Sequence, residues 1–224
     1  MQKPPVFICL AIAIFSGAAC AEERLPEASY DWSGLYAGGS VGYGGGVTTN
    51  SWTNPSSEPA WFADGDIGYS SFMIGAHAGV LHQLDRWAIG FEADYNRVGF
   101  RGNDRQVAGV LNGLEIDQFA SARARAGWTS DRMLVYATGG VAWGDIRKTD
   151  TTLLNQSVSA NVLGWAAGAG VERAVGDNFR IRLEYQHVDL GVADVTFGQG
   201  WASYRHRANG ITFDTVRAGF SYRF

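Results

Sequence analysis

Cysteine is almost absent from the sequence, and with it the chemistry that depends on thiols. The two cysteines, Cys9 and Cys20, lie in an N-terminal stretch with the features of a secretory signal peptide. An apolar run leads to Ala19-Cys20-Ala21, a typical cleavage site before Glu22. We predict a signal peptide at 1–21, with lipidation of Cys20 as the alternative. A mature chain without thiols has neither disulfides nor zinc–cysteine sites, and no metal site is expected.

Long apolar runs, lysine and proline are also scarce. After the signal, no stretch approaches the roughly 18 apolar residues that a transmembrane helix needs, so any membrane crossing must use strands. Proline occurs there only at Pro26, Pro55 and Pro59, outside every predicted strand. Lys148 is the only lysine after the signal, and the formal net charge of −4 argues against nucleic acid as a partner.

What the sequence does have is alternation of apolar and polar residues, in eight segments rich in glycine and aromatics. One face of each segment carries aromatic or aliphatic side chains, and the other carries glycine, small polar residues and charges. Single-chain bacterial barrels have an even number of strands. The segments are 35–43, 72–84, 87–96, 120–128, 135–143, 163–172, 179–186 and 215–224.

Short and long connections alternate between these segments, which predicts an all-β fold: an eight-stranded antiparallel up-and-down transmembrane β-barrel in the cell outer membrane. We place the barrel at 32–224, after a short periplasmic leader at 22–31. A soluble lipocalin-type barrel would hold its apolar residues inside, whereas the charges here share a face with glycine. Tight turns are expected near 84–86, 129–132 and 176–178, and long polar loops at 45–70, 97–117, 147–160 and 189–209.

Aromatic residues gather toward both ends of the predicted strands, which indicates two interfacial girdles. The periplasmic girdle would hold Trp87, Trp128, Phe179 and Phe224, and the outer girdle Tyr43, Phe72, Tyr95 and Trp143.

Charges on the inward face are the strongest candidate site. An eight-stranded barrel is just wide enough for side chains to fill its interior, so charges at similar heights must pair. We interpret them as a structural plug in preference to a conducting pathway, because a selectivity ring carries one dominant sign. This lumen charge network has four residues of each sign: Glu92, Asp94, Arg123, Arg125, Glu172, Arg182, Glu184 and Arg217.

A second group of basic residues lies near the outer strand ends, at the height of lipopolysaccharide phosphates. Arginine binds phosphate through two parallel hydrogen bonds, which predicts lipopolysaccharide contacts. Ordinary solvated loop charge is the alternative. The group consists of Arg97, Arg101, Arg105, Arg147, Lys148, Arg205 and Arg207.

Histidine and tyrosine beside aromatics in the fourth predicted loop are candidate heme ligands, namely His206, Tyr204 and His187. An ordinary solvated loop is the alternative, and no other cofactor is expected. No nucleophile and base occupy adjacent outward positions, so we predict that the protein is not an enzyme.

Several strand motifs together resemble one family. They are Trp32-Ser33-Gly34-Leu35-Tyr36-Ala37-Gly38, Gly90-Phe91-Glu92-Ala93-Asp94, Ala122-Arg123-Ala124-Arg125-Ala126-Gly127-Trp128, Tyr136-Ala137-Thr138-Gly139-Gly140-Val141-Ala142, Gly168-Ala169-Gly170-Val171-Glu172, Leu183-Glu184-Tyr185, Val188-Asp189-Leu190-Gly191 and Thr215-Val216-Arg217-Ala218-Gly219. Over nearly the whole mature chain, the sequence resembles the alphaproteobacterial small outer-membrane proteins. That family holds the 25- and 31-kilodalton surface antigens and the hemin-binding proteins, and is often labelled porin.

The resemblance implies the barrel fold and the outer-membrane location, and it supplies no hemin-ligand motif. It also implies that the terminal aromatics Phe220, Tyr222 and Phe224 are the signal read by the outer-membrane assembly machinery. We predict a structural surface protein that supports the envelope and contacts outer-membrane lipids and lipopolysaccharide. A hemin-binding or adhesive protein and a narrow porin are the alternatives, and the strands name no external ligand.

Overall fold

The computed structural model describes residues 30–53, 60, 62–104, 112–150, 156–198 and 204–224. The predicted signal peptide and most of the predicted leader lie outside these residues. No helix among the described residues is long and apolar enough to span a membrane. The strands are β1 (Gly34–Thr53), β2 (Phe62–Leu84), β3 (Trp87–Asp104), β4 (Asn112–Ser130), β5 (Met133–Asp150), β6 (Gln156–Ala174), β7 (Phe179–Asp189), β8 (Ala193–Phe197) and β9 (Tyr204–Arg223).

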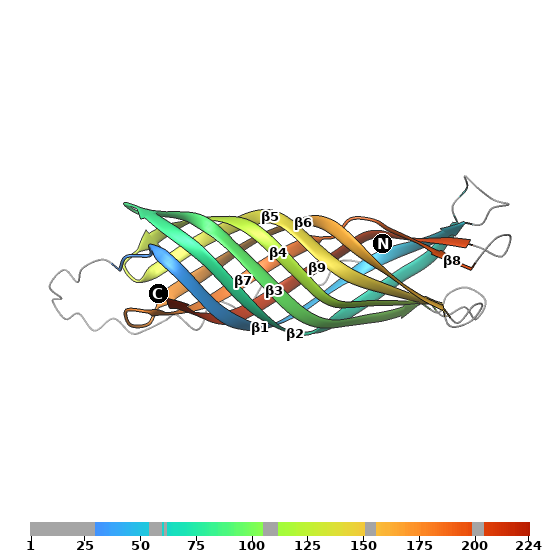
Figure 1. The fold of residues 1–224 in the computed structure, drawn as a ribbon, viewed down its shortest axis with the longest axis horizontal. Coiled ribbons are helices and arrows are strands. Elements are labelled where there is room, and N and C mark those ends of the chain that lie inside the picture. The colour runs from blue at the N-terminus through green and yellow to red at the C-terminus, as the bar shows by residue number, and fades with distance from the viewer. Residues whose placement is uncertain (1–29, 54–59, 61, 105–111, 151–155, 199–203) are drawn as a thin grey trace, which may run out of the picture.

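The strands close into a barrel (Figure 1). Each pairs antiparallel with its neighbours, and β1 pairs with β9 from Tyr36↔Arg223 upward, which closes the ring. The short β8 continues the course of β7 along β9, after an interruption that includes Gly191 at φ +73°. The predicted ring of eight strands is therefore confirmed, with one strand of the ring divided into β7 and β8.

Tight turns join the strands at the end of the barrel where the C-terminus lies (Figure 1). Asp85 and Asp131 adopt positive φ angles of 54° and 49° there, which aspartate tolerates better than most residues. The opposite end differs from the prediction. The expected loop at 45–70 is largely strand, because β1 continues to Thr53 and β2 begins at Phe62.

The strands continue beyond the outer girdle, and there the apolar and polar faces of each strand are exchanged. Below it, apolar side chains face outward; above it, they face inward and pack into an outer apolar layer. Phe100, Phe119 and Phe213 meet there edge to face, with ring centroids 5.1–5.2 Å apart. The outer apolar layer comprises Ile67, Tyr69, Met73, Val98, Phe100, Leu114, Ile116, Phe119, Ala142, Ile146, Val162, Ala166, Val188, Leu190, Ala193, Ala208, Ile211 and Phe213.

Both predicted aromatic girdles face outward. At the periplasmic end, Trp87 and Trp128 are cross-strand partners whose rings meet edge to face at 5.2 Å. At the outer end, Tyr43 and Phe72 form the same kind of pair, also at 5.2 Å. The rings at both levels are about half exposed or more, as expected for side chains that face lipid headgroups.

Candidate functional site

The middle of the barrel holds the lumen charge network, and all eight of its predicted members are buried there. They come from β3, β4, β6, β7 and β9, whose inward positions bring them to one level. Arg123 lies at the centre. Its guanidinium donates to Glu92 at 2.9 Å, and to Asp94 and Glu184 at 3.0 Å each. One arginine thus binds carboxylates from two opposite parts of the wall.

Glu92 accepts hydrogen bonds from three of the arginines. Its carboxylate accepts hydrogen bonds from Arg123, from Arg182 at 2.6 Å and from Arg125 at 3.3 Å. The Tyr36 hydroxyl donates to it at 2.8 Å. Buried carboxylates are stable only when such partners replace water, so each contact offsets part of the desolvation cost.

The remaining predicted members join the same network. Arg217 donates to Asp94 at 3.2 Å and also binds Glu184, and Arg125 binds Glu172. The Tyr136 hydroxyl donates to Glu184 at 2.8 Å. The sequence therefore identified a set of side chains that the fold does bring into contact.

Arg180 is a member that the sequence analysis missed. Its inward parity was readable, but its connection to Glu172, at 3.8 Å, was not. With it, the network holds five arginines (Arg123, Arg125, Arg180, Arg182 and Arg217) and four acids (Glu92, Asp94, Glu172 and Glu184). The balance of four charges of each sign is thus wrong by one positive charge.

Two inward glycines make room for the tyrosines of this network. A Cβ at Gly79 would lie 2.5 Å from the Tyr36 hydroxyl, and one at Gly170 would lie 2.6 Å from the Tyr136 ring. Both distances are too short for real contacts. Glycine at these positions therefore leaves room for the two tyrosine hydroxyls to reach Glu92 and Glu184.

The chain that leads into β1 closes the periplasmic end. Trp32 is fully buried, and its ring lies 4.8 Å below the Arg180 guanidinium carbon. Arg180 also donates to the Tyr30 hydroxyl at 3.0 Å and to the Trp32 carbonyl at 3.1 Å. These residues pack into a periplasmic apolar layer, made of Tyr30, Trp32, Tyr36, Leu81, Ala88, Leu134, Tyr136 and Ala174.

Three of the predicted lipopolysaccharide contacts lie on the outer surface, above the outer girdle. Arg97 is exposed two residues beyond Tyr95, and Arg101 and Arg147 lie on either side of Glu115. Their guanidiniums are 3.7 and 3.9 Å from the Glu115 carboxylate, and at least half of each side chain is exposed to solvent. This outer arginine patch, Arg97, Arg101 and Arg147, could bind external phosphate.

The other members of that group do not share this arrangement. Lys148 is a correction, because its ammonium is buried inside the barrel and donates to Asn50 Oδ1 at 2.8 Å. Its parity is opposite to that of Arg147, so it faces away from lipid. Arg207 donates two hydrogen bonds to Asp194, at 2.7 and 2.8 Å, and Arg205 lies 3.6 Å from the same carboxylate. Arg105 lies outside the described residues.

The contacts of Asp194 change its acidity. The hydrogen bonds from Arg207, assisted by its positive charge and that of Arg205, hold the pKa of the Asp194 carboxyl below its usual value. The two arginines are therefore already engaged by an ionised partner in the hairpin of β8 and β9.

The candidate heme ligands do not converge. His206 is buried inside the barrel, 5.7 Å from the Phe197 ring centroid. His187 lies on the outward face, where its Nδ1 is 2.8 Å from Asp214 Oδ1 and its ring is 5.3 Å from that of Trp165. Two histidines on opposite sides of the wall cannot bind one iron together. The Tyr204 side chain lies outside the described part of the chain.

The C-terminal aromatics end β9 on the lipid-facing side. Phe220, Tyr222 and Phe224 are all exposed, and the Tyr222 ring lies 5.2 Å from Phe179 and 5.3 Å from Phe224. The Phe224 amide donates to the Leu35 carbonyl at 3.0 Å, which ties the end of the chain to β1.

Comparison with known proteins agrees with this architecture. Residues 7–224 match a family model described as the outer membrane protein beta-barrel domain. The chain is 29% identical to the 31 kDa outer-membrane immunogenic protein of Brucella melitensis, over 91% of this chain and 88% of that protein. It is 28% identical to the 25 kDa outer-membrane immunogenic protein of Brucella abortus, over 99% of this chain and 98% of that protein.

A further relative is the 22 kDa outer membrane protein of Rhizobium leguminosarum, 28% identical over 91% of this chain and 83% of that protein. Among solved structures, outer membrane protein OprG of Pseudomonas aeruginosa has a TM-score of 0.61. It covers 88% of this chain and 98% of its own at 10% identity, so this likeness concerns the fold alone.

Proposed function

Because the chain belongs to the outer membrane protein beta-barrel domain family, we propose that it is a structural surface protein with a closed lumen, and neither a channel nor an enzyme. The observation that carries this proposal is the filling of the interior at three successive levels. The lumen charge network lies between the outer and the periplasmic apolar layers. An ion would have to displace packed aromatic rings at both ends and break paired charges in the middle.

The test is planar-bilayer recording with the purified full-length protein. We expect no steady openings at moderate voltage. Ion-selective openings in the wild type, with a size or selectivity changed by Arg123→Ala, would mean that the lumen conducts and would overturn the proposal.

We assign lipopolysaccharide contact to the outer arginine patch. Arg101 and Arg147 share one carboxylate, so their guanidiniums keep donors for an external phosphate. Two acids, Asp117 and Asp145, are partly exposed nearby, so the patch is mixed in charge.

Lipopolysaccharide retained after purification tests this assignment. Replacing Arg97 and Arg147 together by alanine should lower retention about thirtyfold, because each basic side chain near an anionic surface contributes about 1 kcal/mol. The matched control replaces Arg205 and Arg207, which Asp194 already engages. Equal losses in the two double variants would show that the effect is one of general charge and would remove the assignment.

We also propose that Phe220, Tyr222 and Phe224 act as the assembly signal. They lie on the C-terminal strand, which closes the ring by pairing with β1, and they face outward where another protein can reach them. Deleting Phe224 should reduce the amount of folded, heat-modifiable barrel in the membrane. Wild-type levels in that deletion would contradict the role.

A further inference from the structure

The outer half of the wall contains a seam at which neighbouring strands are not paired. The ladder between β6 and β7 ends at Trp165↔Asp189, whereas β6 stays paired with β5 as far as Gln156. Beyond that point β8 pairs with β9, and among the described residues no ladder joins β8 to β6. At the tip, the Gly198 amide donates to the Gln156 side chain at 3.0 Å. We call the two facing edges, 156–164 of β6 and the free side of β8, the outer seam.

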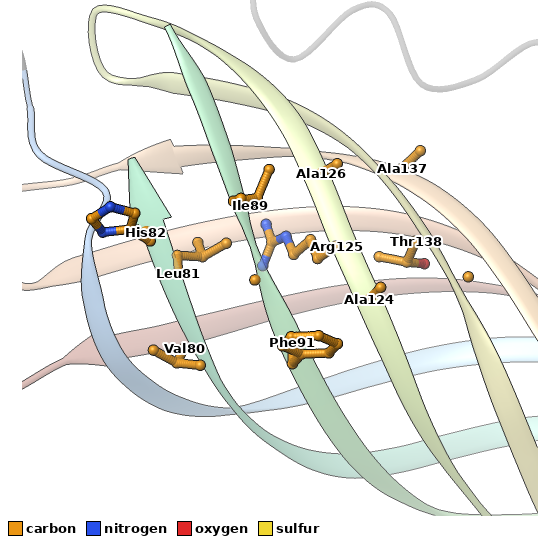
Figure 2. A pocket seen from close by; sticks show the side chains of 12 residues that line it. Val80, Leu81, His82, Ile89, Phe91, Ala124, Arg125, Ala126, Ala137 and Thr138 are labelled. Atoms are coloured by element: carbon orange, nitrogen blue, oxygen red, sulfur yellow. The ribbon is translucent and has the colours of Figure 1, made fainter. Parts of the chain in front are cut away.

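Neighbouring strands stay paired only where the residues opposite each other point to the same side of the wall. Successive residues alternate between the two sides, as on β4, where Arg125 faces the lumen and Ala124 and Ala126 face lipid (Figure 2). β6 keeps one alternation over its whole length, because its buried residues, from Val162 to Ala174, are all even-numbered. A strand that pairs with β6 must match this alternation.

β8 does not continue the alternation of β7. The buried residues of β7 are even-numbered, as at Val188, whereas those of β8 are Ala193, Val195 and Phe197. The change takes place around Gly191, which has a φ of +73°. β9 changes in the same way, so β8 and β9 stay in register. β6 does not change, and the register of β6 and β7 therefore cannot extend to β8.

The outer seam lies outside the membrane-spanning part of the wall. Leu163 of β6 pairs with Trp143 of the outer girdle, and Ser159 pairs with Arg147 of the outer arginine patch. At this height water can hydrogen-bond to the backbone groups of both edges, which lipid cannot do. The seam is therefore stable without a partner and also accessible to one.

The β6 edge lacks two features that natural proteins use to block an exposed edge. Segment 156–164 contains no charged residue and no proline. Its outward side chains, such as Ser159 and Asn161, are exposed, and the inward Val158 and Ala160 are only partly buried. A strand added here would turn small apolar side chains toward the outer apolar layer and polar ones toward water.

We propose that the outer seam binds an extended segment of an external protein by strand addition, with that segment pairing along 156–164 of β6. In an antiparallel ladder, alternate residues direct both backbone groups to one neighbour, so about half of the residues in 156–164 direct theirs into the seam. An extended backbone matches this spacing of donors and acceptors. The interaction takes place outside the membrane and does not depend on whether the lumen conducts.

A second barrel in the same membrane does not fit the seam. Below the seam both walls are closed, so two upright barrels meet face to face. Barrel strands tilt by roughly 35–45° from the axis, and walls that face each other tilt in opposite senses. The β6 edges of two copies would therefore cross steeply and could not run side by side. A chain that approaches from the water has no such restriction.

A designed peptide tests the proposal on the full-length barrel in nanodiscs. The probe is a fluorescein-labelled peptide of alternating threonine and valine, long enough to span 156–164. We expect saturable binding by fluorescence anisotropy and slower hydrogen exchange at 156–164 when the peptide is present. The same peptide with N-methyl groups on the nitrogens that face β6 keeps its side chains but loses its donors. Its binding should be weaker by about tenfold or more.

Closing the seam covalently separates strand addition from general adhesion. The chain has no cysteine after the predicted signal peptide, so engineered pairs supply the only thiols. Ser159→Cys/Thr196→Cys, at exposed positions of β6 and β8 and joined with a short bismaleimide, should abolish binding. The matched control, Thr149→Cys/Ser157→Cys, joins β6 to its existing partner β5 where the two hydroxyls are 2.9 Å apart. It should leave the affinity unchanged.

Several results would overturn the proposal. They are no binding of the parent peptide, equal binding of its N-methylated form, and unchanged binding after β6 is joined to β8. Seam-facing amides of 156–164 that exchange in the free barrel as slowly as those of β5 at the same height would mean that the seam is closed. Protection of these amides by dimerisation of the barrel would assign the seam to a second copy. Heat-modifiable migration confirms that each variant is folded.

Discussion

The two halves of the barrel are built from the same strands with opposite solvents, and β4 shows the contrast most directly. Between the two girdles, Ala122 and Ala124 face lipid while Arg123 and Arg125 face the lumen. Toward the outside, Leu114 and Ile116 are buried in the lumen and Glu115 faces outward. The backbone ladder is continuous apart from a bulge between Ile116 and Gln118.

This contrast shows that backbone hydrogen bonding and the surroundings impose separate requirements on the sequence. A closed ladder satisfies its own hydrogen bonds at any height. Which face carries apolar residues depends on what lies outside the wall: lipid in one half, water in the other. The interior then takes the remaining side chains, so one half is held by ion pairs and the other by packed rings.

The largest expected effect comes from breaking the ionic half. Glu92→Gln removes the acid that holds Arg123, Arg125 and Arg182, and it worsens an excess of positive charge that already exists. We expect a loss of about 3–5 kcal/mol in the free energy of unfolding, measured by denaturant titration in lipid. The double variant Glu92→Gln/Arg182→Met should recover part of that loss, because one stranded cation is gone. A double variant less stable than the single would contradict charge pairing as the cause.

Disrupting the outer apolar layer should lower stability by nearly as much, but the effect should be confined to the outer half of the barrel. Phe213→Ala removes the ring that contacts both Phe100 and Phe119 and leaves a cavity, at a cost of about 3–5 kcal/mol to that layer. Hydrogen exchange should increase in β8 and the outer part of β9 while the membrane half stays protected. If both halves lose protection together, the two layers form one cooperative unit and the halves of the barrel do not unfold independently.

The outer faces can be compared with a single charge. Ala218→Arg puts a guanidinium against lipid near mid-membrane and should destabilise the barrel by about 2–4 kcal/mol. Thr196→Arg, on the exposed face of β8, should change stability by less than about 0.5 kcal/mol. Similar costs at the two positions would mean that β8 also lies in the bilayer.

The smallest effect concerns acid and the hairpin of β8 and β9. The pKa of Asp194 is lowered by Arg207, so the stability that the pair lends is complete above the ordinary carboxyl pKa of 3.8. It is lost as the pH falls through the lowered pKa. Amide chemical shifts of β8 should change at that acidic step, and Asp194→Asn should abolish the change. A transition that persists in Asp194→Asn belongs to another group.

The strands of the membrane half could be predicted from the sequence because the same face, the outward one, is apolar in each of them. At positions such as Phe91 and Glu92, the polarity of the side chain is enough to predict whether it faces lipid or the lumen. The sequence analysis predicted loops in the outer half. The two-residue alternation continues there, but the apolar residues, such as Ile67 and Tyr69, face the lumen and lie between glycines and polar residues. Lys148 was misplaced for the same reason: its parity points inward only if the strand continues.

The sequence could not predict which side chains bind each other within the lumen. Parity gives a side chain's direction, but the reach across the lumen from Arg123 to Glu184, or from Arg180 to Trp32, depends on barrel stagger and on the space left by Gly79 and Gly170. Neither property is encoded in any one strand.

The wide sequence separation within the lumen network has a kinetic consequence. Arg217 binds Asp94 across 123 positions, and its strand must pair with β1 before the ring is complete. Without β9, the carboxylates of β3 lack part of their partners, because Arg217 of that strand binds Asp94. Contacts this distant are slow to form. We therefore expect a sheet that lacks β9 to carry unpaired charge in its interior, which is costly to place in a bilayer.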